Sequence, residues 1–226
     1  METRIFTGSI DRQTRTINAD ERGYLPVPVT RQNEMTTERT ANVLLIDVSG
    51  STEDRISFTD AKCKLIGEKE SSTIFVSNLP SSAYFSLISF SDRAKILHPM
   101  QMLKEKLTVI KAIQSCCSGG FTAMQSAMMK AYDEFKKAPA DYQKRFYCVS
   151  DGMANDGDCR DVADLLKGAG VQLHFIGFGE GSDIDEALMK ELASVSETTG
   201  ESLYRHFSSA QQFSRFMGCQ SRLITK

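Results

Sequence analysis

Three segments of the sequence carry oxygen side chains whose types and spacing suit the binding of a hard divalent cation. The segment DVSGS at 47–51 places one carboxylate and two hydroxyls at alternate positions. Thr122 follows the glycine pair at 119–120, and Asp151 stands directly before Gly152. The set contains no His or Cys, and oxygen ligands alone favour Mg²⁺ or Mn²⁺ over Zn²⁺. These residues therefore predict a magnesium-type site.

The elements that must position these oxygens are strands of a buried sheet. The apolar run VLLI at 43–46 has the composition of a parallel strand that is covered on both faces, and FYCV at 146–149 is a second such run. Short apolar runs and segments of helical periodicity alternate along the chain. We therefore expect an α/β fold with a Rossmann-like open, mostly parallel β-sheet and helices on both faces. In such sheets ligands bind at the carboxyl ends of the strands, where these oxygens lie.

The periodicity also predicts where the individual elements lie. We expect strands at 43–46, 84–90, 94–97, 146–149, 171–178 and 203–204. We expect helices at 59–78, 100–113, 124–137, 162–167, 184–195 and 213–217. Pro80 ends the first of these helices, although the segment SST at 71–73 weakens its second half.

Between Val43 and Met217 the sequence closely resembles the von Willebrand factor A (vWA) domain family. The resemblance lies in D-x-S-x-S, in the threonine after a glycine-rich loop and in Asp-Gly after a core strand. LISFSD at 87–92, HFIGFG at 174–179 and Thr199-Gly200 before Tyr204 support it. In that family the five positions form a metal-ion-dependent adhesion site (MIDAS). The matching residues here are Asp47, Ser49, Ser51, Thr122 and Asp151.

The resemblance implies an intracellular, single-domain member with a complete site and a function in protein binding. The serine and threonine hydroxyls would touch a Mg²⁺ ion, with Mn²⁺ or Ca²⁺ as substitutes, while the carboxylates can act through bound water. An Asp or Glu of a protein partner would complete the coordination shell. The resemblance further implies that the chain is an adaptor or subunit of a cytosolic complex. Such a complex could be an ATPase, a kinase or phosphatase, or a stress or metal-resistance system.

Other readings of the same residues stay open at this point. Asp47 could cap a turn, and Ser49 and Ser51 could satisfy loop amides. A Mg²⁺-dependent phosphoryl-transfer or hydrolytic enzyme could use Asp47 as nucleophile and Asp151 as metal ligand. Ser49, however, stands where an aspartyl phosphotransferase would want a second Asp as general acid, and no G-x-x-x-x-G-K-[ST] motif occurs. We therefore expect no catalytic activity.

Composition excludes several broad classes of protein. The 226 residues include 27 Lys and Arg against 29 Asp and Glu, so a net charge of −2 argues against a dedicated nucleic-acid binder. We expect no signal peptide, and no apolar run is long enough to span a membrane. The six cysteines form no C-x-x-C pair, which favours reduced thiols in the cytoplasm.

The chain is expected to divide into an N-terminal polar arm or edge hairpin (1–40), a vWA domain (41–220) and a C-terminal tail (221–226). The arm could also serve as the main contact by adding a strand to a neighbouring protein. The acidic segment at 151–158 resembles a calcium loop, but Asp156 occupies the position that requires glycine, and Val162 stands where the loop needs Glu. We expect Asn155-Asp156-Gly157 to be a solvated turn near the metal site.

Overall fold

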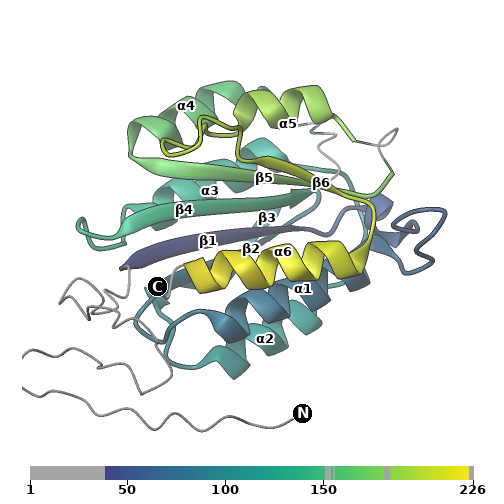
Figure 1. Ribbon diagram of the computed structural model, residues 1–226, viewed down its shortest axis with the longest axis horizontal. Coiled ribbons are helices and arrows are strands. Elements are labelled where there is room, and N and C mark those ends of the chain that lie inside the picture. The colour runs from purple at the N-terminus through teal and green to yellow at the C-terminus, as the bar shows by residue number, and fades with distance from the viewer. Residues whose placement is uncertain (1–38, 151–153, 155, 181–183, 224–226) are drawn as a thin grey trace, which may run out of the picture. The chain divides into compact units, whose positions relative to one another are not determined.

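The computed structural model describes residues 39–150, 154, 156–180 and 184–223, and their centre is a single β-sheet (Figure 1). Its strand order is β3-β2-β1-β4-β5-β6. The strands are β1 (Thr40–Asp47), β2 (Tyr84–Phe90), β3 (Ala94–Met102), β4 (Gln143–Ser150), β5 (Val171–Phe178) and β6 (Tyr204–Phe207). β3 runs antiparallel to β2, and every other neighbouring pair is parallel.

Helices cover both faces of this sheet, as Figure 1 shows. One face packs against α3 (Met124–Phe135), α4 (Arg160–Gly168) and α5 (Glu186–Leu192). The other packs against α1 (Lys64–Asn78), α2 (Lys106–Gln114) and α6 (Ala210–Leu223). A short 3₁₀-helix, η2 (Gly50–Glu53), follows β1. The predicted Rossmann-like α/β class is confirmed.

The central strand β1 explains why the site forms where it does. All eight of its residues are buried, as a strand with helices on both faces requires. β1 pairs with β2 on one side and with β4 on the other. The chain thus builds the sheet outward from β1 in two directions, and the order reverses between β1 and β4. This is the topological switch point at which open α/β sheets bind their ligands.

The helix predicted at 59–78 starts later than expected, because α1 begins at Lys64. Asp60 accounts for the difference. Its carboxylate accepts a hydrogen bond from the backbone N–H of Lys62 at 3.2 Å and another from that of Ala210 at 3.0 Å. These contacts hold the preceding segment as a loop against the start of α6. Local hydrogen bonding by Asp competes with helix formation in this way.

The second half of α1 stays helical despite its β-branched and hydroxyl residues. Ser71 and Ser72 are fully buried, and 3.0 Å separates the hydroxyl of Ser71 from that of Ser214 on α6. Small side chains at this contact let the two helices approach closely. Tertiary packing therefore outweighs the weak helix propensity of the segment.

The helix predicted at 100–113 is wrong in its first part. Met100 lies in β3, and α2 begins only at Lys106. Among the described strands β3 is an edge strand, and Pro99 is tolerated there because one side of β3 has no ladder partner within this part of the chain. The backbone N–H of Met100 donates to the buried carboxylate of Glu134 on α3. This pairing spans 34 residues, and hydrophobic periodicity does not report it.

The remaining predictions agree with the structure to different degrees. The strands expected at 84–90 and 171–178 are β2 and β5. The helix expected at 184–195 is shortened to α5. The helix expected at 213–217 is lengthened to α6, which runs to Leu223 and so extends past the domain boundary predicted at residue 220 into the predicted tail. The predicted arm at 1–40 falls almost wholly outside the described residues and stays a prediction.

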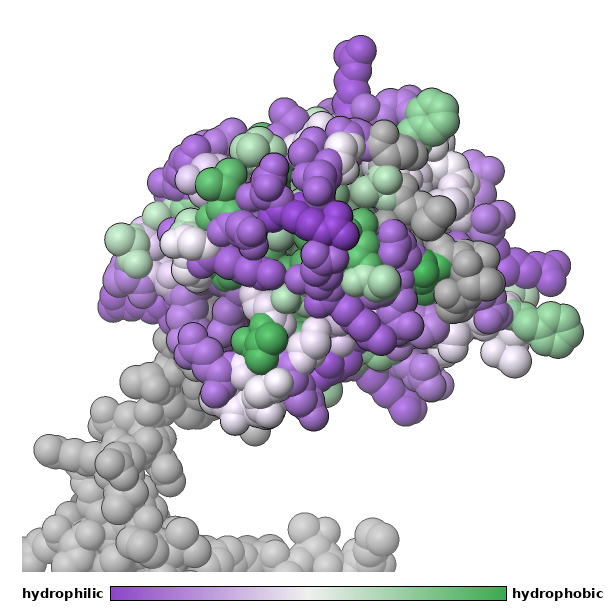
Figure 2. All heavy atoms as spheres, turned by 90° about the horizontal axis from the view of Figure 1, so that it is seen from above, coloured by the Kyte–Doolittle hydropathy of each residue, from purple (hydrophilic) through white to green (hydrophobic). Residues whose placement is uncertain are grey.

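Residues Thr37–Lys226 form one compact unit. Figure 2 looks onto the side of α4 and α5 and shows a mostly hydrophilic surface with scattered hydrophobic side chains. Within the described part of the chain, no helix combines the length and the apolar character needed to cross a lipid bilayer.

Candidate metal centre

Asp47, the last residue of β1, lies fully buried at the carboxyl end of the central strand. Its Oδ1 accepts a hydrogen bond from the backbone N–H of Ser49 at 2.8 Å. Its Oδ2 accepts one from the hydroxyl of Ser150, the last residue of β4, at 2.5 Å. An isolated carboxylate would be very costly to bury, so these bonds are what allow it here. They also fix the direction of both carboxylate oxygens.

The two serines of the D-x-S-x-S segment lie with their hydroxyls together. The Oγ atoms of Ser49 and Ser51 are 3.1 Å apart. Thr52 holds this turn, because its hydroxyl donates to the carbonyl of Ser49 at 2.7 Å and its N–H donates to the same carbonyl at 3.1 Å. Ser49 is only 2% exposed. Both hydroxyls therefore project from a turn whose backbone is fixed.

The glycine pair before Thr122 joins its loop to the serine turn. Gly119 donates its N–H to the carbonyl of Val48 at 2.8 Å, and Gly50 donates to the carbonyl of Gly120 at 3.0 Å. Gly120 has a φ of +85°, which favours glycine. A Cβ at Gly120 would lie 2.7 Å from the carboxylate of Asp92. The absent side chain lets this carboxylate reach the loop.

Thr122 itself is anchored through the residues on each side of it. Phe121 donates its N–H to Asp92 Oδ1 at 2.8 Å. Ala123 donates its N–H to the carbonyl of Ser91 at 2.7 Å. Both acceptors lie in the turn between β2 and β3, and Thr122 is 5% exposed. The threonine is thus fixed at the start of α3, as its position after the glycine pair predicts.

Four of the five predicted site residues lie in the described chain, and all four are at the carboxyl ends of the central strands. Asp47, Ser49 and Ser51 form one hydrogen-bonded group, and the loop of Thr122 is bonded to their turn. Asp151 lies outside the described residues, directly after Ser150 of β4. Its assignment to the site stays a prediction.

The chemistry of the described oxygens fits a hard cation. Two neutral hydroxyls lie 3.1 Å apart beside an oriented carboxylate, and Cys148 of β4 is buried. Burial, with a smaller contribution from the charge of Asp47, raises the pKa of the Cys148 thiol well above its usual value. Across the described residues, His, Cys, Asp and Glu side chains form no group of three or more that could hold a metal. A site here depends on hydroxyl ligands.

Three residues that support the site are not predicted from the sequence. Ser150 orients Asp47, Asp92 anchors the loop of Thr122, and Asp156 accepts hydrogen bonds at the start of α3. Asp156 does not fit the expectation of a merely solvated turn. Ser150 is the last residue of β4, and Asp92 follows β2 in the turn before β3. Both lie at the carboxyl end of a core strand, and that position is a signal that could have found them. Asp156 has no comparable signal.

A family model described as von Willebrand factor type A domain matches residues 43–220. Uncharacterized protein sll0103 of Synechocystis sp. is 25% identical over 150 residues, which are 64% of this chain and 34% of that protein. The chain therefore spans about a third of the length of this curated relative.

Solved structures with 16–20% sequence identity share the fold. A von Willebrand factor type A protein from Catenulispora acidiphila has a TM-score of 0.64 at 16% identity, over 83% of this chain and 43% of that one. An aerotolerance-related membrane protein from Bacteroides fragilis has a TM-score of 0.65 at 16% identity, over 81% and 99%. Proximal thread matrix protein 1 from the mussel byssus, with a zinc-occupied MIDAS motif, has a TM-score of 0.66 at 20% identity, over 83% and 47%. The family match covers well over half of the sequence, and the chain belongs to the von Willebrand factor type A domain family.

Proposed function

We propose that this chain binds a partner protein through a divalent cation held at the carboxyl ends of β1 and β4. Ser49, Ser51 and Thr122 would supply hydroxyl ligands, and Asp47 and Asp151 would act through bound water. The observation that carries the proposal is the pair of serine hydroxyls, 3.1 Å apart, next to a buried and doubly hydrogen-bonded Asp47. We propose Mg²⁺ as the physiological ion, with Mn²⁺ or Ca²⁺ as substitutes.

The choice of ligands explains why a partner carboxylate would bind there. Neutral hydroxyls do not cancel the charge of a divalent cation, so a cation held mainly by them attracts a further anionic oxygen. Asp47 is tied to Ser49 and Ser150 and cannot rotate to take that place without breaking buried hydrogen bonds. The open coordination position is therefore left for an Asp or Glu of the partner.

The zinc-occupied MIDAS motif of the mussel byssus protein supports metal binding by this fold. The preference for Mg²⁺ over Zn²⁺ rests on the ligands of this chain, which are all oxygen. Calorimetry of the full chain with Mg²⁺, Mn²⁺, Ca²⁺ and Zn²⁺ tests the preference. Zn²⁺ binding alone would not contradict it, because Zn²⁺ generally binds more tightly than Mn²⁺ and exposed thiols also bind zinc. A Zn²⁺ signal that Asp47→Ala removes, with no measurable binding of Mg²⁺ or Mn²⁺ to the wild-type chain, would contradict it.

As part of this proposal, the chain is a non-enzymatic adaptor or subunit of a cytosolic ATPase, kinase, phosphatase or stress-response complex. All six cysteines are free thiols, which supports a reducing compartment. Ser49 stands where a phosphotransferase of the aspartyl type would want an acid, which argues against catalysis. Incubation of the Mg²⁺-loaded protein with phosphate esters and nucleotides is expected to give no turnover. Turnover that Asp47→Asn abolishes would favour the enzyme instead.

The decisive experiment measures metal binding first and partner binding second. Titration calorimetry with Mn²⁺ should show one site in the wild-type protein and none in Asp47→Ala or Thr122→Ala. Thr122→Ser keeps the hydroxyl and should retain the site. A partner captured by the wild-type protein should then be lost with EDTA and from both alanine variants. Mn²⁺ binding that survives both alanine substitutions would overturn the proposal.

A further inference from the structure

The helix that follows Thr122 begins without a cap of its own. α3 starts at Met124, and its N-cap residue is Ala123, which has no side-chain oxygen. The first N–H groups of a helix have no partner inside the helix, so they need acceptors from elsewhere. Ser, Thr, Asp or Asn at the N-cap commonly provides one.

Asp156, in the loop between β4 and α4, supplies these acceptors from a distant part of the sequence. Its Oδ1 accepts the N–H of Gln125 at 2.9 Å. Its Oδ2 accepts the N–H of Ser126 at 2.9 Å and the hydroxyl of Ser126 at 2.7 Å. The carboxylate thus uses both oxygens on the first turn of α3. The partial positive charge of a helix N-terminus favours an anion in this position.

Two further contacts join the same loop to α3. Gln125 Nε2 donates to the carbonyl of Asp158 at 2.7 Å. Gly157 lies between the two aspartates with a φ of +139°, and a Cβ there would lie 2.3 Å from Gln125 Oε1. A side chain at residue 157 would displace the Gln125 amide from this position, and the positive φ favours glycine. Several hydrogen bonds therefore hold the loop against the helix.

This contact lies between two of the segments that the proposed metal site requires. The carbonyl of Thr122 accepts the N–H of Met124 at 2.9 Å, so Thr122 is continuous with the first turn of α3. Ser150 is bonded to Asp47, and the chain from Ser150 is fixed again at Asp156. Asp151 belongs to the chain between these two fixed points.

We propose that Asp156 is a positioning residue of the metal site: it fixes the start of α3, and with it Thr122. The inference rests on the proposed function. Asp156 acts through other residues and is not itself assigned as a ligand. Groups that orient metal ligands without touching the metal commonly affect affinity by about 10-fold to 100-fold when they are removed.

Asp158 provides a matched control in the same loop. Its Oδ1 accepts the N–H of Arg160 at 2.9 Å in the first turn of α4, so it caps a helix as Asp156 does. That helix carries none of the proposed ligands. The full chain is compared as wild type, Asp156→Ala, Asp158→Ala and Asp47→Ala, with Mn²⁺ affinity measured by calorimetry and stability measured by urea unfolding in EDTA.

We expect Asp156→Ala to weaken Mn²⁺ binding about 10-fold and Asp158→Ala to leave it unchanged, although both lower stability. Asp156→Asn keeps one acceptor oxygen and should bind Mn²⁺ with intermediate affinity; it replaces Asp156→Ala in the comparison if that variant does not fold. Wild-type affinity in the Asp156 variants, or equal losses in the Asp158 control, would overturn the positioning role. If Asp47→Ala still abolishes binding in that case, the proposed function stands. Absence of Mn²⁺ binding in the wild type would overturn both proposals.

Discussion

The hydroxyl of Ser150 donates a hydrogen bond to Asp47 Oδ2 at 2.5 Å, although the two residues are 103 positions apart in the sequence. The bond joins the last residue of β4 to the last residue of β1, side by side in the centre of the sheet. Ser150 is 1% exposed and Asp47 is fully buried. A short hydrogen bond to a buried carboxylate is among the stronger ones in proteins. It holds the Asp47 carboxylate in place at the end of β1.

Replacing Ser150 with Ala should therefore both destabilise the protein and weaken Mn²⁺ binding. Loss of a hydrogen bond to a charged group costs about 2 kcal/mol, to be measured by urea unfolding in EDTA. Ser86 is the control, because it is also fully buried but donates to a neutral acceptor, the carbonyl of His98, at 2.9 Å. Ser86→Ala should cost about 1 kcal/mol and leave the Mn²⁺ affinity unchanged. Equal affinity in Ser150→Ala and the wild type would show that the bond does not orient Asp47 for the metal.

Gly120→Ala should disturb the loop of Thr122. The φ of +85° at this position costs a residue with a side chain about 1–2 kcal/mol, and the new Cβ would lie 2.7 Å from the carboxylate of Asp92. We expect lower stability and weaker Mn²⁺ binding. Gly168→Ala is the matched control, because a Cβ there meets no atom within 4 Å and the residue is helical. That change should be neutral or stabilising by up to about 1 kcal/mol; a comparable loss at both glycines would refute the explanation.

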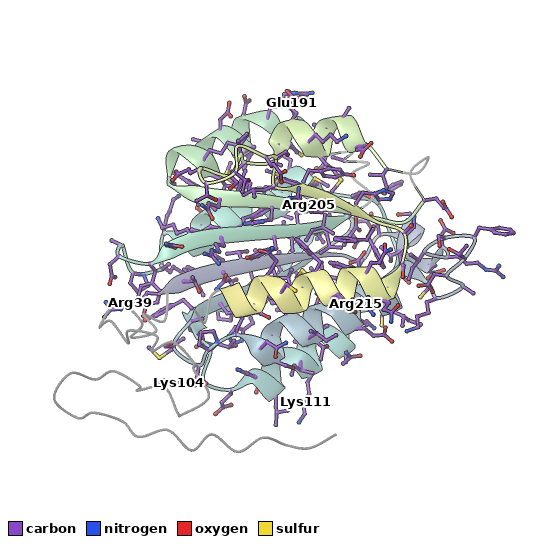
Figure 3. The ribbon with its side chains drawn as sticks, viewed as in Figure 1. Arg39, Lys104, Lys111, Glu191, Arg205 and Arg215 are labelled. Atoms are coloured by element: carbon purple, nitrogen blue, oxygen red, sulfur yellow. The ribbon has the colours of Figure 1, made fainter. Side chains whose placement is uncertain are left out.

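The free energy of unfolding should fall once the solution is acidic enough to protonate an ordinary histidine. His174 is 7% exposed and stacks on Tyr147 with 4.7 Å between ring centroids. Burial, and then the charges of Arg145 and Arg205, lower its pKa from the ordinary 6.5 to about 3. Arg205 lies on β6 (Figure 3). The unfolded chain binds this proton below pH 6.5 and the folded chain does not, so the stabilisation is complete above pH 6.5 and is lost as the pH falls toward 3.

The expected loss from this histidine is about 2 kcal/mol between pH 7 and pH 5, measured by urea unfolding at each pH. His174→Phe keeps a ring against Tyr147 but cannot be protonated. Between pH 7 and pH 5, the free energy of unfolding of this variant should fall by about 2 kcal/mol less than that of the wild type. Identical pH profiles for the variant and the wild type would contradict the lowered pKa of His174.

The thiols should fall into two classes of reactivity. Cys117 and Cys219 are exposed, whereas Cys148 and Cys159 are buried. Burial raises the pKa of the Cys148 thiol well above its usual value and that of the Cys159 thiol to about 12, and the thiolate is the reactive form. Brief treatment with iodoacetamide at pH 8, followed by peptide mass spectrometry, should label the exposed pair and spare the buried pair until urea is added. Early labelling of Cys148 would show that the sheet opens.

The parts of the fold that the sequence predicts well are those whose signal is local. The apolar run at 43–46 identifies β1 because a strand covered on both faces needs nothing but apolar side chains, and the oxygens of 47–51 then follow at its end. Gly119-Gly120 likewise predicts a loop before α3, since both residues have a positive φ. The structure joins the turn of Asp47, Ser49 and Ser51 to the loop of Thr122 by hydrogen bonds at this edge of the sheet, and their binding of a metal stays a prediction.

The parts that the sequence does not predict depend on partners far away along the chain. Met100 has helical spacing with its neighbours, yet it lies in β3, where its N–H meets Glu134. Asp156 has the local sequence of a turn, and its contacts with α3 lie about 30 residues back. Hydrophobic periodicity records which face of an element is buried. It does not record which distant backbone groups a carboxylate will reach.

The reversal of strand order beside β1 has a consequence for folding kinetics. The bonded pair of Asp47 and Ser150 is separated by 103 residues, so the chain must close a very long loop before these two strand ends meet. A cation bound there can stabilise only states in which β1 and β4 have already paired. If that pairing is completed after the transition state, Mg²⁺ should slow unfolding and leave the folding rate nearly unchanged. The lifetime of the folded protein would then be set by the metal concentration around it.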